Sequence, residues 1–184
     1  MNRAWKIIVI VLLLTVVAAA GKRDPLTDAE TDQLREAATQ PYLRLKLFIK
    51  FANVRLDSIQ QLQSDPKAAD GRGRKIHDLL EDFTAILDEI NDNLDQYQGR
   101  PLERLDRNNF RDGLKAFIAA ADGFDLRLKT LRAAAQSDPQ TRKEAMDFQF
   151  VLQDAQEALK SSLDIAQEYL QDDPAKKKAA EKKK

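Results

Sequence analysis

The 184-residue sequence contains no cysteine. This absence excludes disulfide bonds, thiolate nucleophiles, iron–sulfur ligation, covalent haem attachment and a lipid-modified N-terminal cysteine. If the chain works in an oxidising compartment, its fold therefore depends on the hydrophobic core without covalent cross-links.

Histidine is almost as scarce, because His77 is the only one. This excludes a di-metal bundle site built from two Glu-x-x-His motifs, and also a three-histidine zinc site. A Ser-His-Asp triad would depend on His77, which has no serine near it in the sequence. The chain also lacks a glycine-rich phosphate loop and a Gly-x-Ser-x-Gly elbow. We therefore predict a non-enzymatic protein with no catalytic residue, metal site or cofactor. An enzyme that uses only carboxylates stays open as an alternative.

Glycine and proline number only six each, while 43% of the residues are apolar and 33% are charged. This composition favours long helices with charged surfaces and argues against a β fold with many turns. The formal net charge of zero hides an asymmetry. Residues 21–174 hold 22 basic and 29 acidic residues, whereas the last ten hold six lysines and one glutamate. An acidic body argues against nucleic-acid binding.

The lysine-rich tail, residues 174–184, has no apolar residue larger than alanine and is predicted to lack fixed structure. It either keeps the protein in solution, contacts an anionic surface or acidic partner of the envelope, or folds back on the acidic body. The lysines concerned are Lys176, Lys177, Lys178, Lys182, Lys183 and Lys184.

The first twenty residues resemble a secretory signal peptide in their layout. Arg3 and Lys6 precede an apolar run from Ile7 to Ala20, which ends in three alanines. A run of this length is short for a membrane-spanning helix. We therefore predict a cleaved signal peptide over residues 1–20 and an exported protein, periplasmic or secreted. The alternative is an uncleaved segment that anchors the protein in the membrane.

The rest of the chain shows helical periodicity between clear breaks. Helices are expected over 28–38, 42–63, 76–97, 102–136 and 140–171. The breaks are Pro41, the Asp-Pro pairs at 65–66, 138–139 and 173–174, and the Gly99-Arg100-Pro101 turn. The predicted fold is all-α: an antiparallel up-down bundle of about four long helices over residues 41–173, preceded by a short helix within residues 21–40.

Two arginines, Arg44 and Arg55, fall within the apolar arc of the helix over 42–63. They are eleven residues apart and therefore nearly in line along the helix. Either their heads reach the surface between two neighbouring helices, or they bind a buried carboxylate or an anionic ligand.

His77 and Met146 suggest a second class of function, a small-molecule or haem-binding bundle. Both residues lie near the N-terminal ends of helices expected to run parallel, and hence near the same end of the bundle. His/Met axial ligation of a non-covalent haem is known in such bundles. The more ordinary interpretation is a partly exposed histidine and a methionine that fills a gap.

The leading functional hypothesis is an exported bundle that binds a partner protein or an apolar segment in the cell envelope. Its basis is the lack of a catalytic motif together with the wide apolar faces of two helices. The face of the helix over 140–171 is widened by Met146, Phe150, Val151 and Leu163. The arc of the helix over 42–63 includes Leu43, Leu47, Phe51 and Val54. Such a face is either covered within the molecule or open to a partner, and the burial of these side chains distinguishes the two. The sequence does not determine the oligomeric state.

Overall fold

The computed structural model describes residues 23–98 and 104–171. The predicted signal peptide, the Gly99-Arg100-Pro101 turn and the lysine-rich tail lie outside these ranges. The elements are α2 (Asp28–Glu36), α3 (Pro41–Ser64), the short 3₁₀ helix η1 (Pro66–Ala68), α4 (Arg72–Gln98), α5 (Arg104–Ser137), α6 (Pro139–Ala145) and α7 (Gln149–Gln171). The described residues form no strand, so the predicted all-α bundle is confirmed. None of the described helices has the length and apolarity needed to cross a membrane.

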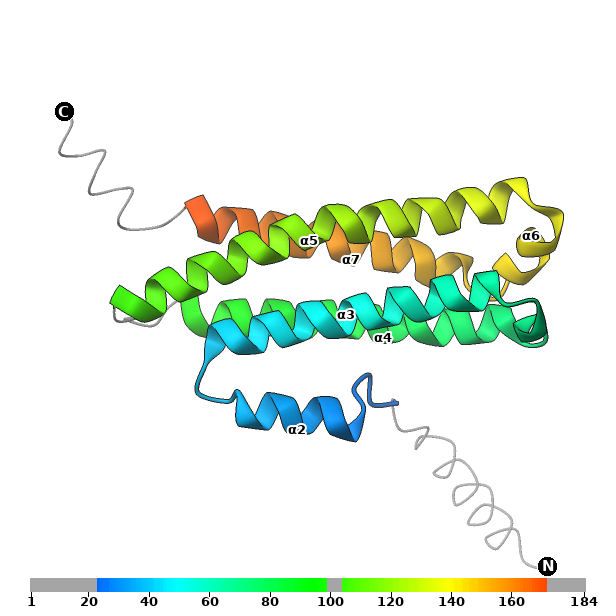
Figure 1. Cartoon of the computed structure of the whole chain (residues 1–184). Helices are drawn as coiled ribbons and strands as arrows, with labels where there is room; N and C mark the ends of the chain where they lie inside the picture. Colours follow the sequence, from blue (N-terminus) through cyan, green and yellow to red (C-terminus); the bar gives the residue numbers. More distant parts are fainter. Residues whose placement is uncertain (1–22, 99–103, 172–184) are drawn as a thin grey trace, which may run out of the picture.

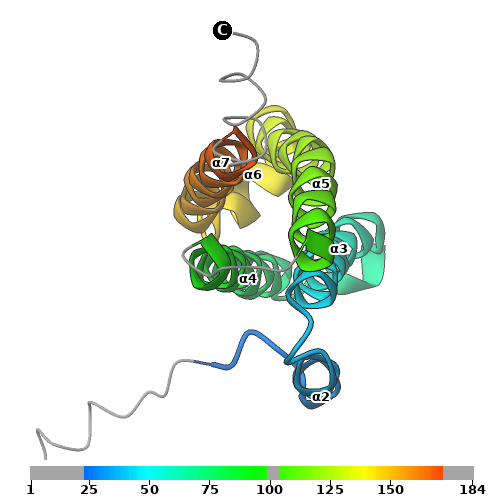
Figure 2. The same cartoon turned by 90° about the vertical axis from the view of Figure 1, so that its left-hand side faces the viewer.

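The helices lie in three layers (Figure 1). α5 and α7 form one layer, α3 and α4 form the next, and α2 lies on the outer side of the α3–α4 layer. Chain direction alternates from α3 through α4 and α5 to α7, as predicted for an up-down bundle. Seen along the bundle axis, α3 packs against α4 and α5, and α7 packs against the same two helices (Figure 2). The consecutive helices α4 and α5 therefore lie on a diagonal, and the parallel pairs α3–α5 and α4–α7 are neighbours.

The core lies between the two layers of long helices and is formed by the periodic apolar residues of the sequence. Phe83 of α4 and Phe124 of α5 meet across the diagonal, with ring centroids 5.6 Å apart and ring planes at 88°. Both side chains are almost completely buried. Near the ends of α4 and α7, the Tyr169 hydroxyl donates a hydrogen bond of 2.5 Å to Asp95. Burial and this contact together raise the pKa of Tyr169 to about 12.

The prediction of one helix over 140–171 is wrong, because α6 ends at Ala145 and α7 begins at Gln149. At the break, the backbone hydrogen bonds tighten to a three-residue spacing: Asp147 donates to Glu144 and Phe148 to Ala145. The break leaves Met146 exposed while Phe148 is fully buried. The apolar spacing continues through it, so periodicity gave no sign of an interruption.

α4 begins at Arg72, between Gly71 and Gly73. Of these two glycines, Gly71 has a positive φ, of 64°. Gly73 lies in the first turn of α4. The last residues of α6 and those that follow it pack closely against Gly73. A Cβ placed on it would lie 2.5 Å from Asp147 Oδ2 and 2.6 Å from the Glu144 carbonyl oxygen. The missing side chain thus permits the contact between the start of α4 and the end of α6.

We expect Gly73→Ala to lower the free energy of unfolding by about 1–3 kcal/mol, since a backbone oxygen must move to admit the methyl group. Gly123→Ala is the matched control, because Gly123 is exposed and a Cβ there would meet nothing within 4 Å. This control should raise the free energy of unfolding by about 1 kcal/mol through helix propensity. Urea unfolding followed by circular dichroism measures both values. An equal stabilisation by the two alanines would refute the close contact at Gly73.

Candidate functional site

Arg55 of α3 is the most completely buried basic residue of the described chain, with 6% of its surface exposed. Its Nη1 and Nη2 donate hydrogen bonds of 2.8 and 2.6 Å to the two carboxylate oxygens of Glu30 in α2. Nη2 also donates to the Pro25 carbonyl oxygen at 2.6 Å. Arg55 therefore binds a buried carboxylate, as one of the two sequence interpretations proposed, and this carboxylate belongs to the chain itself.

Glu30 is held from two sides. Thr27 and Glu30 form the capping box that begins α2, in which the Thr27 amide donates to Glu30 Oε2 at 2.9 Å. The spacing of Thr27 and Glu30 is the sequence signature of a capping box, whereas no local pattern indicates the ion pair of Glu30 with Arg55. The only signal for a partner was the position of Arg55 within an apolar arc, where a buried charge requires compensation.

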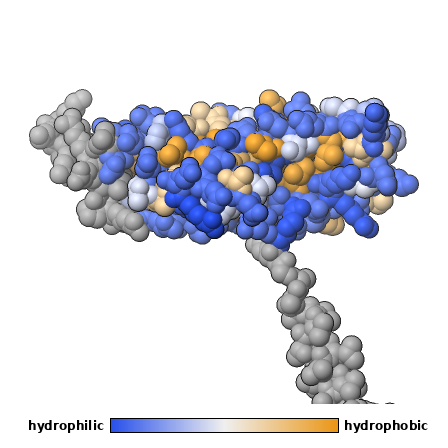
Figure 3. All heavy atoms as spheres, turned by 60° about the horizontal axis from the view of Figure 1, so that its bottom comes forward, coloured by the Kyte–Doolittle hydropathy of each residue, from blue (hydrophilic) through white to orange (hydrophobic). Residues whose placement is uncertain are grey.

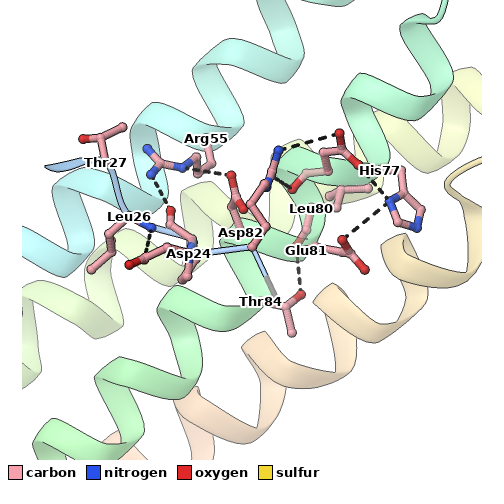
Figure 4. Close-up of polar contacts among 12 residues, drawn as sticks. Asp24, Leu26, Thr27, Arg55, His77, Leu80, Glu81, Asp82 and Thr84 are labelled. Carbon is pink, nitrogen blue, oxygen red and sulfur yellow. Dashed lines mark hydrogen bonds and ion pairs between the residues drawn. The ribbon is translucent and has the colours of Figure 1, made fainter. Parts of the chain in front are cut away.

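Asp82 of α4 lies beside Arg55 (Figure 4) and takes part in a second ion pair. Arg23 Nη2 donates a hydrogen bond of 2.6 Å to Asp82 Oδ1, and Arg55 Nε lies 3.6 Å from Asp82 Oδ2. We call Arg23, Glu30, Arg55 and Asp82 the Arg55 cluster. It joins the segment before α2, α2 itself, α3 and α4, and its formal charges cancel. Its groups bind one another, so the cluster fastens α2 to the bundle and leaves the Arg55 guanidinium little capacity for an external ligand.

The two carboxylates beside Arg55 differ in protonation behaviour. Burial raises the pKa of Glu30, but the hydrogen bonds from Arg55 and Thr27 outweigh it and hold the pKa below its ordinary value. At Asp82 burial prevails over the attraction of Arg23 and Arg55, so its pKa lies above its ordinary value.

These opposite shifts predict opposite pH dependences. The lowered pKa of Glu30 gives stability that is present above about pH 4.3 and is lost as the pH falls through the folded-state value. The raised pKa of Asp82 gives stability that is present below about pH 3.9 and is lost as the pH rises through its folded-state value. Glu30→Gln should therefore destabilise the protein at neutral pH and flatten its acid denaturation. Asp82→Asn should cost much less at neutral pH. Unfolding free energies between acidic and neutral pH test this, and equal losses in both variants at neutral pH would contradict it.

Arg44 also contacts α2. Its Nη1 lies 3.4 Å from the Leu34 carbonyl oxygen, and its guanidinium lies 5.7 Å from the centroid of the Phe48 ring. The side chain is half-buried between α2 and α3, as expected for an arginine that reaches out between two helices. Arg44 and Arg55 thus contact α2 at two separate positions along α3.

His77 and Met146 are the two candidate haem ligands of the sequence. His77 Nδ1 lies 3.3 Å from Asp78 and 3.8 Å from Glu81, so the histidine contacts carboxylates of its own helix. Met146 is 66% exposed at the break between α6 and α7. The pairing of these two residues on a haem stays a prediction. His77, Asp78 and Glu81 bring three possible ligand atoms within 4.8 Å of one another. Because they lie in the exposed and half-buried surface of a single helix, we assign no metal to them.

The wide apolar arc of α3 is only partly covered. Phe51 is buried and Leu47 is half-buried, but Leu43 and Val54 keep 39% and 41% of their surface exposed. On the neighbouring helix α5, Leu126 is 65% exposed. We call the solvent-facing surfaces of α3 and α5, on which Leu43, Val54 and Leu126 are exposed at separate positions, the α3–α5 face. Figure 3, which brings the α2 side of the molecule forward, shows a mainly hydrophilic surface with a row of apolar groups across its middle.

Val54 and Leu126 lie at similar heights on the α3–α5 face. Arg127 Nη1 donates a hydrogen bond of 2.7 Å to Asp57 Oδ1, which sets the register of the two parallel helices. At 1.5 Å rise per residue, Val54 and Leu126 are then within about 3 Å of each other along the axis. A groove of about 210 Å³ lies between α3 and α5, and Leu126 is one of its lining residues. Its walls are mostly apolar and include Leu56, Ile59, Leu126, Leu128 and Leu131.

Charge divides the bundle into two sides. The α3–α5 pair carries 11 basic and 5 acidic residues, whereas the α4–α7 pair carries 4 basic and 11 acidic residues. Because the members of each pair are neighbours (Figure 2), the exposed apolar residues of the α3–α5 face lie on the basic side. The helix order that creates this separation could not be deduced from the sequence.

The chain matches no protein-family model, no curated protein and no solved structure.

Proposed function

We propose that this protein is an exported, non-enzymatic helical bundle that binds a partner protein in the cell envelope through its α3–α5 face. The observation that carries the proposal is the mostly apolar groove between α3 and α5, which the exposed Leu126 helps to line and which lies on the basic side of the bundle. Leu43 and Val54 add exposed apolar side chains elsewhere on α3. An apolar groove with an exposed leucine in its wall is typical of an interaction surface. The signal-like segment over residues 1–20 supports the proposed location.

The chemistry of the face indicates the kind of partner. Lys46 and Lys50 of α3 are both exposed. Lys46 Nζ lies 4.4 Å from the centroid of the Tyr42 ring, and Lys50 Nζ donates a hydrogen bond of 3.3 Å to Gln33 Oε1 of α2. An amphipathic helix with acidic flanks would cover the apolar groove with one side and place its carboxylates beside these lysines. The acidic α4–α7 side of the bundle would repel the same segment. Binding would therefore be restricted to the α3–α5 face.

Site-specific photocrosslinking in living cells tests this proposal. A photoreactive amino acid at Val54 or at Leu126 should yield the same discrete adduct. The same amino acid at Asp164, an exposed position of α7, should yield none. Lys46→Glu combined with Lys50→Glu should weaken the adduct, and the crosslinked segment of the partner should be acidic and amphipathic. Adducts of equal yield from Asp164, or none from the α3–α5 face, would overturn the proposal.

A further inference from the structure

A second concave site lies where α5 ends and α6 joins α7. Its volume is about 290 Å³, at the lower end of the range of small-molecule sites. The floor is part of the core, because Phe148, Ala145 and Leu152 are 0%, 5% and 3% exposed. Two of the residues that shape it are alanines, Ala135 and Ala145, whose small side chains leave the space open. The break between α6 and α7 thus creates an apolar hollow at the surface.

The rim of this hollow is positively charged. Arg132 and Arg142 line it together with three glutamines, and none of its described lining residues is acidic. Arg142 donates a hydrogen bond to the Gln136 carbonyl oxygen, which orients it on the rim. Arg132 is exposed and has no hydrogen-bond or ion-pair partner among the described residues. A guanidinium without a carboxylate partner at the edge of an apolar hollow suits an anionic group.

Phe150 adds an exposed aromatic ring to the site. It lines the same hollow and is 72% exposed, more than any other large apolar side chain of the described residues. A straight helix over 140–171 would carry Phe150 on the widened apolar face that the sequence predicted. The break instead leaves its ring at the mouth of the hollow, where it offers an uncovered aromatic surface to a ligand.

From this combination we propose that the hollow binds an apolar carboxylate: an alkyl or aryl body seated on Phe148 and against Phe150, with the carboxylate between Arg132 and Arg142. The volume suits a medium-length acyl chain or one apolar side chain at a peptide C-terminus. The two arginines would repel a cationic ligand. A neutral ligand would leave the Arg132 guanidinium without an anionic partner. The site is separate from the α3–α5 face and does not depend on the function proposed for that face.

Two probes distinguish the sources of such a carboxylate: decanoate, and a tripeptide that ends in phenylalanine with a free carboxyl group. Titration followed by amide chemical shifts should show that at least one binds and perturbs Ala135, Phe148 and Phe150. Decanol or the amidated peptide should bind about tenfold more weakly. Whichever probe binds identifies the source. If neither binds, or if the shifts map to the α3–α5 groove, the proposal is wrong.

Variants of the rim and the floor provide the second test. Arg132→Gln should weaken binding about tenfold, while the matched control Arg127→Gln, on the same helix but outside the hollow, should leave it unchanged. Ala135→Leu should fill the hollow and abolish binding. Circular dichroism and the unfolding midpoint establish that each variant is folded. A folded Arg132→Gln variant with undiminished affinity for the binding probe would overturn the assignment of the anionic subsite.

Discussion

Arg55→Ala is expected to lower the free energy of unfolding by about 3–5 kcal/mol, because it leaves the buried Glu30 carboxylate without its cation. The two hydrogen bonds to Glu30 and the one to the Pro25 carbonyl oxygen disappear together. Since these contacts join α2 to α3, the variant should also expose α2 to proteolysis before the rest of the bundle. Urea unfolding gives the first quantity, and limited digestion followed by mass spectrometry gives the second.

The Asp32–Arg35 pair supplies a matched control on α2. Its N···O distance is 2.7 Å, close to that of the Arg55–Glu30 pair, but its side chains are 66% and 75% exposed. Arg35→Ala should cost less than about 0.5 kcal/mol, since exposed ion pairs contribute little. Replacing Arg55 and Glu30 together by methionine should recover most of the loss, because no buried charge is then unpaired. An Arg55→Ala variant as stable as Arg35→Ala would contradict the role assigned to the Arg55 cluster.

Phe83→Ala is expected to lower the free energy of unfolding by about 3–5 kcal/mol. Phe83 is fully buried and meets Phe124 edge to face, so truncation removes the contact that joins the two layers across the diagonal. The loss includes the transfer free energy of the ring and the cost of the cavity that remains.

Phe150→Ala is the control for this truncation, because the same change is made at a 72% exposed position. We expect its effect on stability to stay within about 0.5 kcal/mol. Both variants are measured by urea unfolding under identical conditions. A loss of the same size in both, or a negligible loss for Phe83→Ala, would show that Phe83 is not at the centre of the core.

Much of this architecture could be predicted from the sequence because periodic apolar residues and proline breaks are local signals. The residues from Ile76 to Tyr97 recur at helical spacing, and most of them are buried in α4. The capping box at Thr27 likewise needs only four residues, and it is present. Local patterns failed where a contact between distant segments decides the outcome, as at the break after Ala145 and at the contact of Gly73 with Glu144.

The candidate surfaces were less predictable for the same reason. Arg55 stood out in the sequence, but its partner Glu30 lies 25 residues away on another helix. Leu43 and Val54 were candidates for a partner groove, yet only helix packing shows that they stay exposed while Phe51 is buried. The separation of charge into a basic α3–α5 side and an acidic α4–α7 side depends on the diagonal placement of α4 and α5, which no local pattern encodes.

The partner-binding proposal requires that the bundle core closes within one chain and leaves Val54 and Leu126 uncovered. The most direct test is the urea unfolding midpoint of the purified protein, measured over about a hundredfold range of protein concentration. A self-contained bundle predicts one cooperative transition whose midpoint does not change with concentration. A midpoint that rises with concentration would mean that a second copy covers these residues and completes the fold, and the account would then be wrong.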